Sequence, residues 1–187
     1  MKKILFIIIA LLLIVQPNFG AKKDKHSKKK VTQNIQLFDS EAQYRSNANT
    51  LIEAVCERIA GNIVQAQSTL QKLISDNPKY DLAHFEYAKI LLMQNKTTEA
   101  ISELTIAINL NDSNDWFKVL LAECYDKISQ YDKSETLWKI LAEHHSDNVE
   151  YFYKYALSLI YQNKLKEAVV AYNKIESLMG VNEDISN

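Results

Sequence analysis

Apolar residues recur along the chain with the spacing of helices rather than strands. In 81–94, "DLAHFEYAKILLMQ", and again in 95–110, "NKTTEAISELTIAINL", apolar side chains return every three or four residues. This places them on one face of a helix, since a helix turns once in 3.6 residues. The two apolar runs are separated by the short polar segment 94–98. The pattern therefore predicts two helices joined by a turn, which form a helical hairpin.

The hairpin is repeated. The octets "MQNKTTEA" (93–100) and "YQNKLKEA" (161–168) lie 68 residues apart, and half that separation, 34, aligns the intervening sequence as well. A fixed period of this length is the signature of a stacked repeat. Two columns hold small residues: Ala54, Ala88, Ala122 and Ala156 in the first, and Ala66, Ala100, Ser134 and Ala168 in the second. The third column holds large residues, Leu70, Leu104, Trp138 and Tyr172. The fourth is apolar, with Leu73, Ala107, Leu141 and Ile175. We predict four hairpins.

A turn column separates the two helices of each hairpin. It holds residues that tolerate left-handed or capping conformations, namely Gly61, Asn95, Ser129 and Asn163. The segments "SDNP", "NDSN" and "HSDN" join successive hairpins, and their Asp and Asn side chains can cap the next helix. Small side chains in the first two columns would let the paired helices approach closely.

These columns resemble the tetratricopeptide repeat (TPR), a 34-residue helix-turn-helix unit with small residues at its eighth and twentieth positions. The units would be 47–80, 81–114, 115–148 and 149–180, followed by the end 181–187. The resemblance implies an all-α, right-handed solenoid. The first unit departs from it, because Glu53 and Glu57 stand where apolar residues are expected. Leu51, Ile52, Val55 and Ile59 would supply a shifted apolar face, and this unit is either rotated or an N-terminal cap.

The resemblance also implies a concave groove, lined by the first helix of each hairpin, that binds peptides or partner helices. The candidate groove residues are Leu51, Val55, Phe85, Lys89, Trp116, Val119, Glu123, Tyr153, Leu157 and Tyr161. The alternative for Phe85 and Trp116 is a place in the core. Glu123 would repel a carboxylate, so the sequence argues against a clamp for a partner's C-terminus. The segment "NIQLF" (34–38) could dock in the groove or cap the first hairpin.

The N-terminus has the pattern of a targeting segment. Lys2 and Lys3 precede twelve apolar residues, 4–15, and small residues follow at Gly20 and Ala21. A membrane-spanning helix needs about 20 apolar residues, so we interpret 1–20 as a cleaved signal peptide of a protein exported to the bacterial periplasm or envelope. The alternative is an uncleaved anchor in the inner membrane, because the basic segment Lys22–Lys30 resists translocation.

The charge is divided unevenly. Residues 21–30 carry six lysines and one acidic residue, whereas 31–187 carry 14 basic and 22 acidic residues. We expect a basic tail and lead-in over 21–46, which is either a solvated spacer or a contact to anionic membrane lipid. The acidic remainder argues against nucleic acid as a partner, because phosphate binding needs clustered Lys and Arg.

Candidate chemistry is sparse, and we predict no catalytic, cofactor-binding or metal site. Cys56 and Cys124 occupy the same tenth position two repeats apart, which is too far for a disulfide and suggests buried structural thiols. His144 and His145 are adjacent, so they do not form the i, i+4 pair of a helical zinc site.

The last helix would leave the face near Val169, Tyr172 and Leu178 open, which fits a homodimer contact or a longer parent chain. Three functions remain open on the sequence alone. The first is a non-enzymatic interaction scaffold in the envelope. The second is an assembly or tethering protein acting through its basic tail and self-association. The third is the regulatory subunit of an enzyme.

Overall fold

The computed structural model describes residues 25–180, with side-chain surroundings from residue 41 onward. The chain divides into two compact units, 1–44 and 45–187. The predicted signal peptide, the side chains of Lys22–Lys30 and of the segment 34–38, and the end 181–187 lie outside what is described. No helix within 25–180 is long and apolar enough to cross a membrane, and the apolar run 4–15 is not among these residues.

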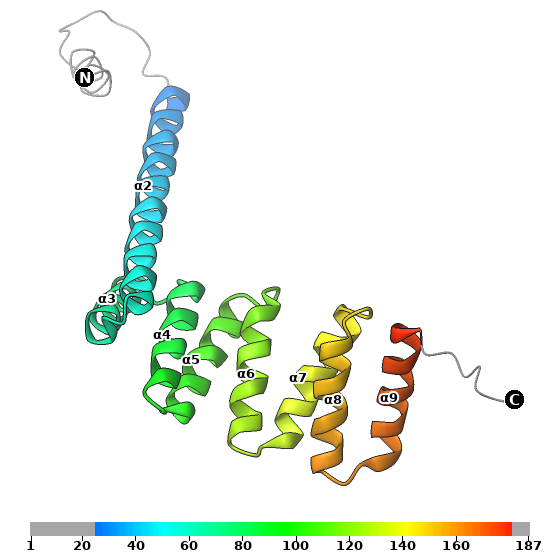
Figure 1. The fold of residues 1–187 in the computed structure, drawn as a ribbon. Helices are drawn as coiled ribbons and strands as arrows, with labels where there is room; N and C mark the ends of the chain where they lie inside the picture. The colour runs from blue at the N-terminus through cyan, green and yellow to red at the C-terminus, as the bar shows by residue number, and fades with distance from the viewer. Residues whose placement is uncertain (1–24, 181–187) are drawn as a thin grey trace, which may run out of the picture. The chain divides into compact units, whose positions relative to one another are not determined.

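All regular structure within residues 25–180 is helical (Figure 1). Three helix pairs follow α2 and α3 and lie side by side in the order of the chain. The helices are α2 (Lys25–Ile59), α3 (Ile63–Asp76), α4 (Asp81–Met93), α5 (Thr97–Leu110), α6 (Asp115–Lys127), α7 (Tyr131–His144), α8 (Val149–Tyr161) and α9 (Leu165–Met179). The fold is an all-α helical solenoid of hairpins, as predicted.

The small-residue columns are buried where the helices pack against one another. Ala54, Ala88, Ala122 and Ala156 are fully buried, and so are Ala66, Ala100 and Ser134 of the second column. A larger side chain at these places would push the helices apart, because protein interiors are packed as densely as organic crystals. The large column fills the space left between hairpins, and its Trp138 is the largest fully buried side chain among the described residues.

The turn column adopts the predicted left-handed conformation in all four hairpins. The φ angle is 84° at Gly61, 61° at Asn95, 57° at Ser129 and 61° at Asn163. The next residue donates its backbone N–H to a carbonyl five positions earlier, as Lys96 N does to Leu91 O at 2.9 Å. Such a bond satisfies one of the carbonyls left free at a helix end. The sequence therefore repeats a residue type because the backbone repeats a conformation.

A second recurring contact ties the end of each of the first three repeats to its start. Asn77 donates to Asn47 at 3.0 Å, Asn111 donates to Asp81 at 2.8 Å, and His145 donates to Asp115 at 2.8 Å. Each pair is separated by 30 residues. These contacts fix the loop that leads from one hairpin to the next.

Two buried polar side chains occupy the fourth position of their first helices. His84 has one ring nitrogen 2.6 Å from Glu103 Oε2 and the other 3.0 Å from the carbonyl of Pro78. Lys118 donates to the carbonyl of Asp112 and pairs with the Asp115 carboxylate at 3.2 Å. Because a buried polar group is costly unless it is hydrogen-bonded, these contacts explain how a His and a Lys are accommodated there.

The first hairpin corrects two sequence predictions. Ile52 and Ile59 are exposed, so the expected shifted apolar face does not form there. Ala54, Leu70 and Leu73 are instead buried in the regular register of the repeat. Cys56 is exposed, which contradicts its interpretation as a buried thiol, whereas Cys124 is buried; both cysteines are free, as predicted. Helix α2 also includes residues 25–46.

Candidate partner-binding surface

The outward side chains of the first helices form what we call the first-helix surface, made by residues 45–59 of α2 and by α4, α6 and α8. All ten predicted groove residues belong to these helices. Six are half-buried, namely Leu51, Val55, Phe85, Lys89, Val119 and Leu157, and four are exposed, namely Trp116, Glu123, Tyr153 and Tyr161. The exposed aromatic side chains are therefore confined to α6 and α8 within this set.

The α4 part of the surface is tightly engaged with its neighbours. The Phe85 ring lies 4.9 Å from the Phe117 ring of α6, centroid to centroid, and the Lys89 ammonium lies 4.5 Å above Phe85. Lys89 also bonds Glu86 at 2.7 Å, and Glu86 pairs with Arg58 of α2 at 3.1 Å. Phe85 thus packs between hairpins, as the core alternative supposed, whereas Trp116 is 69% exposed and does not belong to the core.

A small cavity of about 220 Å³ opens between α6, the start of α7 and α8. It is lined by Asp126, Tyr131, Lys154, Leu157, Ser158 and Tyr161. The Tyr131 and Tyr161 rings stack at 4.5 Å. Asp126 accepts a hydrogen bond from the indole N–H of buried Trp138 at 2.9 Å. The cavity brings together two predicted groove residues, Leu157 and Tyr161, with a carboxylate and an ammonium.

Glu123, a residue of α6, is close to Lys154 and Asp126, two residues that line this cavity. Partial burial raises the pKa of Glu123, the positive charge of Lys154 opposes that rise, and the negative charges of Glu150 and Asp126 add to it. Its side chain still reaches solvent. The carboxylate is thus held where ionisation is less favourable than in water.

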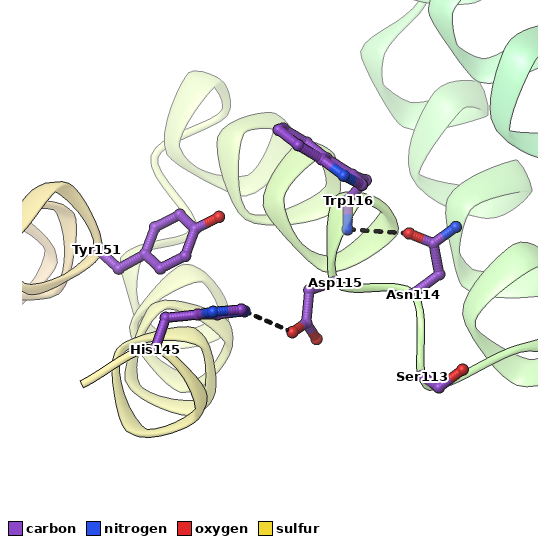
Figure 2. A pocket seen from close by; sticks show the side chains of 6 residues that line it. All are labelled: Ser113, Asn114, Asp115, Trp116, His145 and Tyr151. Carbon is purple, nitrogen blue, oxygen red and sulfur yellow. Dashed lines mark hydrogen bonds and ion pairs between the residues drawn. The ribbon is translucent and has the colours of Figure 1, made fainter. Parts of the chain in front are cut away.

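A larger cavity of about 440 Å³ opens where α6 begins. We call it the aromatic slot, and its lining residues are Ser113, Asn114, Asp115, Trp116, His145 and Tyr151. Figure 2 shows the Trp116 indole and the Tyr151 phenol on opposite sides of the space, with the Tyr151 hydroxyl directed into it and the His145 to Asp115 bond below. The Asn114 side chain caps α6 by accepting from Trp116 N at 3.2 Å, which fixes the backbone that carries the indole.

Asp115 is the charged centre beneath the slot. His145 donates to it at 2.8 Å, His144 lies 3.5 Å away, and the Lys118 ammonium lies 3.2 Å away. Burial alone would raise the pKa of Asp115, but the hydrogen bonds from His145 and Lys118 outweigh it and leave this pKa below its usual value. Asp115 is therefore ionised near neutral pH, and its contacts with His144 and His145 link the start of α6 to the end of α7.

Several lining residues were not among the predicted site residues. Tyr151 meets Trp116 only because consecutive hairpins stack, whereas His145 comes from the far end of the same repeat as Trp116. A usable signal existed for one pair, because Asn77, Asn111 and His145 share one position of the repeat while Asn47, Asp81 and Asp115 share another. No such column marks Tyr131 or Asp126.

The surface offers aromatic faces, aliphatic side chains and isolated charges. Within residues 25–180 no three His, Cys, Asp or Glu side chains are placed to hold a metal ion. Burial raises the pKa of the Cys124 thiol to about 11, so this thiol is protonated and unreactive at neutral pH. These features suit non-covalent recognition of a peptide or a helix.

Comparison with solved structures finds the same kind of fold. The crystal structure of MamA protein aligns with a TM-score of 0.65 and 17% identity, covering 87% of this chain and 91% of that one. MamA 41-end from Desulfovibrio magneticus RS-1 aligns with a TM-score of 0.63 and 14% identity, over 74% and 78% of the two chains. YrrB, described as a TPR protein with an unusual peptide-binding site, aligns with a TM-score of 0.63 and 13% identity, over 69% and 66%.

No protein-family model matches the chain, and comparison with curated proteins found no match either. The structural likeness at these identities establishes a TPR-like fold.

Proposed function

We propose that this chain is a non-enzymatic protein-interaction scaffold whose first-helix surface binds a peptide segment or a helix of a partner. The observation that carries the proposal is the placement of exposed aromatic side chains on α6 and α8. Trp116 is 69%, Tyr153 45% and Tyr161 63% exposed. Trp and Tyr side chains are frequent anchors of protein interfaces, where a partner covers their rings.

The fold supports the proposal because it presents the first helices side by side. YrrB shares this fold and is described as having a peptide-binding site. A regulatory subunit of an enzyme is the alternative, and it would use the same surface to bind its catalytic partner. The proposal assigns no catalytic residue and no cofactor to this chain.

Affinity capture from an envelope extract tests the proposal. The double variant Trp116→Ala, Tyr153→Ala removes two exposed rings, and the matched double variant Val64→Ala, Ile106→Ala removes exposed apolar side chains from the second helices α3 and α5. We expect the first variant to lose at least about tenfold of a specific partner's binding, since an anchor residue is worth about 1–2 kcal/mol or more. The control should retain it. Equal partner sets for both variants and the wild type would refute the assignment.

We further propose that the protein acts in the bacterial envelope after export, because residues 1–21 have a basic start, an apolar run and small residues at the end. Mass spectrometry of the protein from the periplasmic fraction tests this. A chain that begins near residue 21 is expected, and a membrane-bound chain that retains residues 1–20 would favour the anchor. Deletion of Lys22–Lys30 tests whether the basic segment tethers the protein to a membrane or cell-wall surface. If it does, the deletion variant should no longer be found at that surface.

Self-association through α9 is a second candidate role. Val169 is 57% exposed. Ile101, at the same position of the repeat in α5, is half-buried and packs against a core cluster that includes Leu121 and Cys124 of α6. Leu165 is likewise exposed, and Tyr172 and Leu178 are half-buried. Light scattering over a range of concentrations tests this role. A dimer that is abolished by Val169→Glu is expected, and a strict monomer at high concentration would exclude it.

A further inference from the structure

The aromatic slot differs from the rest of the first-helix surface because its most exposed wall is a tryptophan. The Asn114 cap fixes the Trp116 backbone at the start of α6, and the indole lines one side of the cavity. The opposite wall is held by ring contacts. The Tyr151 ring is half-buried, with the Trp138 ring centroid 6.1 Å and the His145 ring centroid 5.5 Å away. The slot therefore presents two positioned aromatic walls about a space that opens to solvent (Figure 2).

The charges around the slot have an excess of one sign. Asp115 lines the slot, and Asp112 and Glu150 are the sequence neighbours of the lining residues Ser113 and Tyr151. When His144 and His145 are neutral, Asp112 and Asp115 share the buried ammonium of Lys118. Burial raises the pKa of the Tyr151 phenol, and the negative charges of Asp115 and Glu150 raise it further. A cation entering the slot would meet a negative potential and two aromatic walls.

The smaller cavity at the other end of α6 and α8 lacks this combination. Its lining includes the Lys154 ammonium, and its two tyrosine rings stack on each other at 4.5 Å. A cation there would be repelled by Lys154, and one face of each ring is already covered. The negative charge and the uncovered faces of Trp116 and Tyr151 therefore make the aromatic slot, rather than the smaller cavity, the better site for a cation.

We propose that the aromatic slot binds the guanidinium of an arginine side chain in the partner segment. This inference rests on the proposed function and names the partner chemistry of one part of the surface. A guanidinium is planar, always charged and more weakly hydrated than an ammonium, so it stacks on an indole at a smaller desolvation cost than lysine would incur. Asp112 and Glu150 flank the lining residues Ser113 and Tyr151 in sequence, and both are exposed, the Asp112 side chain to 82%, so each can accept guanidinium N–H groups.

Nuclear magnetic resonance of the full chain tests the proposal with a defined probe. The chain has two tryptophans, and Trp138 is 1% exposed, so the indole N–H signal of Trp116 is identified by its loss in Trp116→Leu. The probe is the capped tripeptide acetyl-Ala-Arg-Ala-amide, at about pH 8 so that ordinary imidazoles are neutral. The matched probe carries citrulline, which has the same shape without the charge.

We expect the arginine peptide to shift the Trp116 signal saturably, with citrulline binding at least about fivefold more weakly, equivalent to about 1 kcal/mol. Glu150→Gln should weaken arginine binding by about two- to fivefold, whereas Glu99→Gln, an exposed carboxylate on α5, should not. Equal binding of the two peptides, no shift of Trp116 up to the solubility limit, or no effect of Glu150→Gln would each overturn the proposal.

The outcome is separable from that of the proposed function. If the Trp116→Ala, Tyr153→Ala double variant loses its partner but the arginine peptide does not bind the wild-type chain, the first-helix surface remains the partner site and the arginine assignment is wrong. If the arginine peptide binds but partner capture is unchanged in the double variant, the slot recognises arginine and the wider surface is not the partner site.

Discussion

Replacing Ala122 with leucine perturbs the contact on which the whole repeat depends. Ala122 is fully buried in a cluster with Trp138 and Leu141, against which Val119 and Tyr151 pack. If space existed, the three added carbon atoms would stabilise the fold by about 2 kcal/mol, at about 0.8 kcal/mol for each buried CH₂. Because the surroundings are closed and densely packed, the side chain must instead displace its neighbours. We expect a loss of about 1–3 kcal/mol.

Urea unfolding followed by far-ultraviolet circular dichroism measures this loss. The variant should unfold at lower urea concentration with an unchanged slope, since a changed slope would indicate a different folded or unfolded state. Ala42→Leu is the matched control, because Ala42 is an exposed residue of helix α2, and its effect should stay within about 0.5 kcal/mol. An Ala122→Leu variant as stable as the wild type would refute the close approach of α6 and α7 at this position.

Three further predictions follow from particular residues. Ser129→Gly should stabilise the protein by about 1 kcal/mol in urea unfolding, because glycine adopts the left-handed conformation found at Ser129, φ 57°, without a steric penalty; unchanged or lower stability would contradict this. Asp115→Asn should destabilise the protein near neutral pH by about 0.5–1.5 kcal/mol. Because the pKa of Asp115 is lowered in the folded protein, its stabilisation is present above the ordinary Asp value of about 3.9 and is lost as the pH falls toward the folded value. Plots of unfolding free energy against pH for wild type and Asp115→Asn should therefore converge in acid. A constant difference between them would contradict the mechanism. In the native protein one thiol, that of exposed Cys56, should react rapidly with a thiol reagent, while buried Cys124, with its pKa raised to about 11, should react only on unfolding; equal rates would show that Cys124 is accessible.

The hairpin fold could be predicted because packing and backbone geometry each restrict a column to one kind of residue. Close helix contact requires a small side chain at Ala88 and Ala122, and the left-handed turn favours residues such as Asn95 and Gly61. These are local requirements, which the sequence repeats whenever the structure repeats.

What the sequence did not predict depends on where a residue stands in the stack. Cys56 and Cys124 share a repeat position, but only Cys124 packs in a cluster with Ala100 and Leu104 of the preceding hairpin. Cys56 belongs to the first hairpin of the repeat and is exposed. The aromatic slot was missed for a related reason, since Trp116 and Tyr151 come from different hairpins and belong to no shared column. The proposed recognition therefore depends on residues that do not recur, and periodicity gives no information about them.

The central claim is that the first-helix surface, and not the second helices, contacts a partner. Its most direct test is site-specific photo-crosslinking in living cells, with a photoreactive amino acid placed at Tyr153 on α8, at Trp116 on α6, or at Val64, an exposed residue on α3. The account predicts that Tyr153 and Trp116 yield the same cross-linked partner and that Val64 does not. Cross-linking of that partner from Val64 with none from Tyr153 and Trp116 would contradict it.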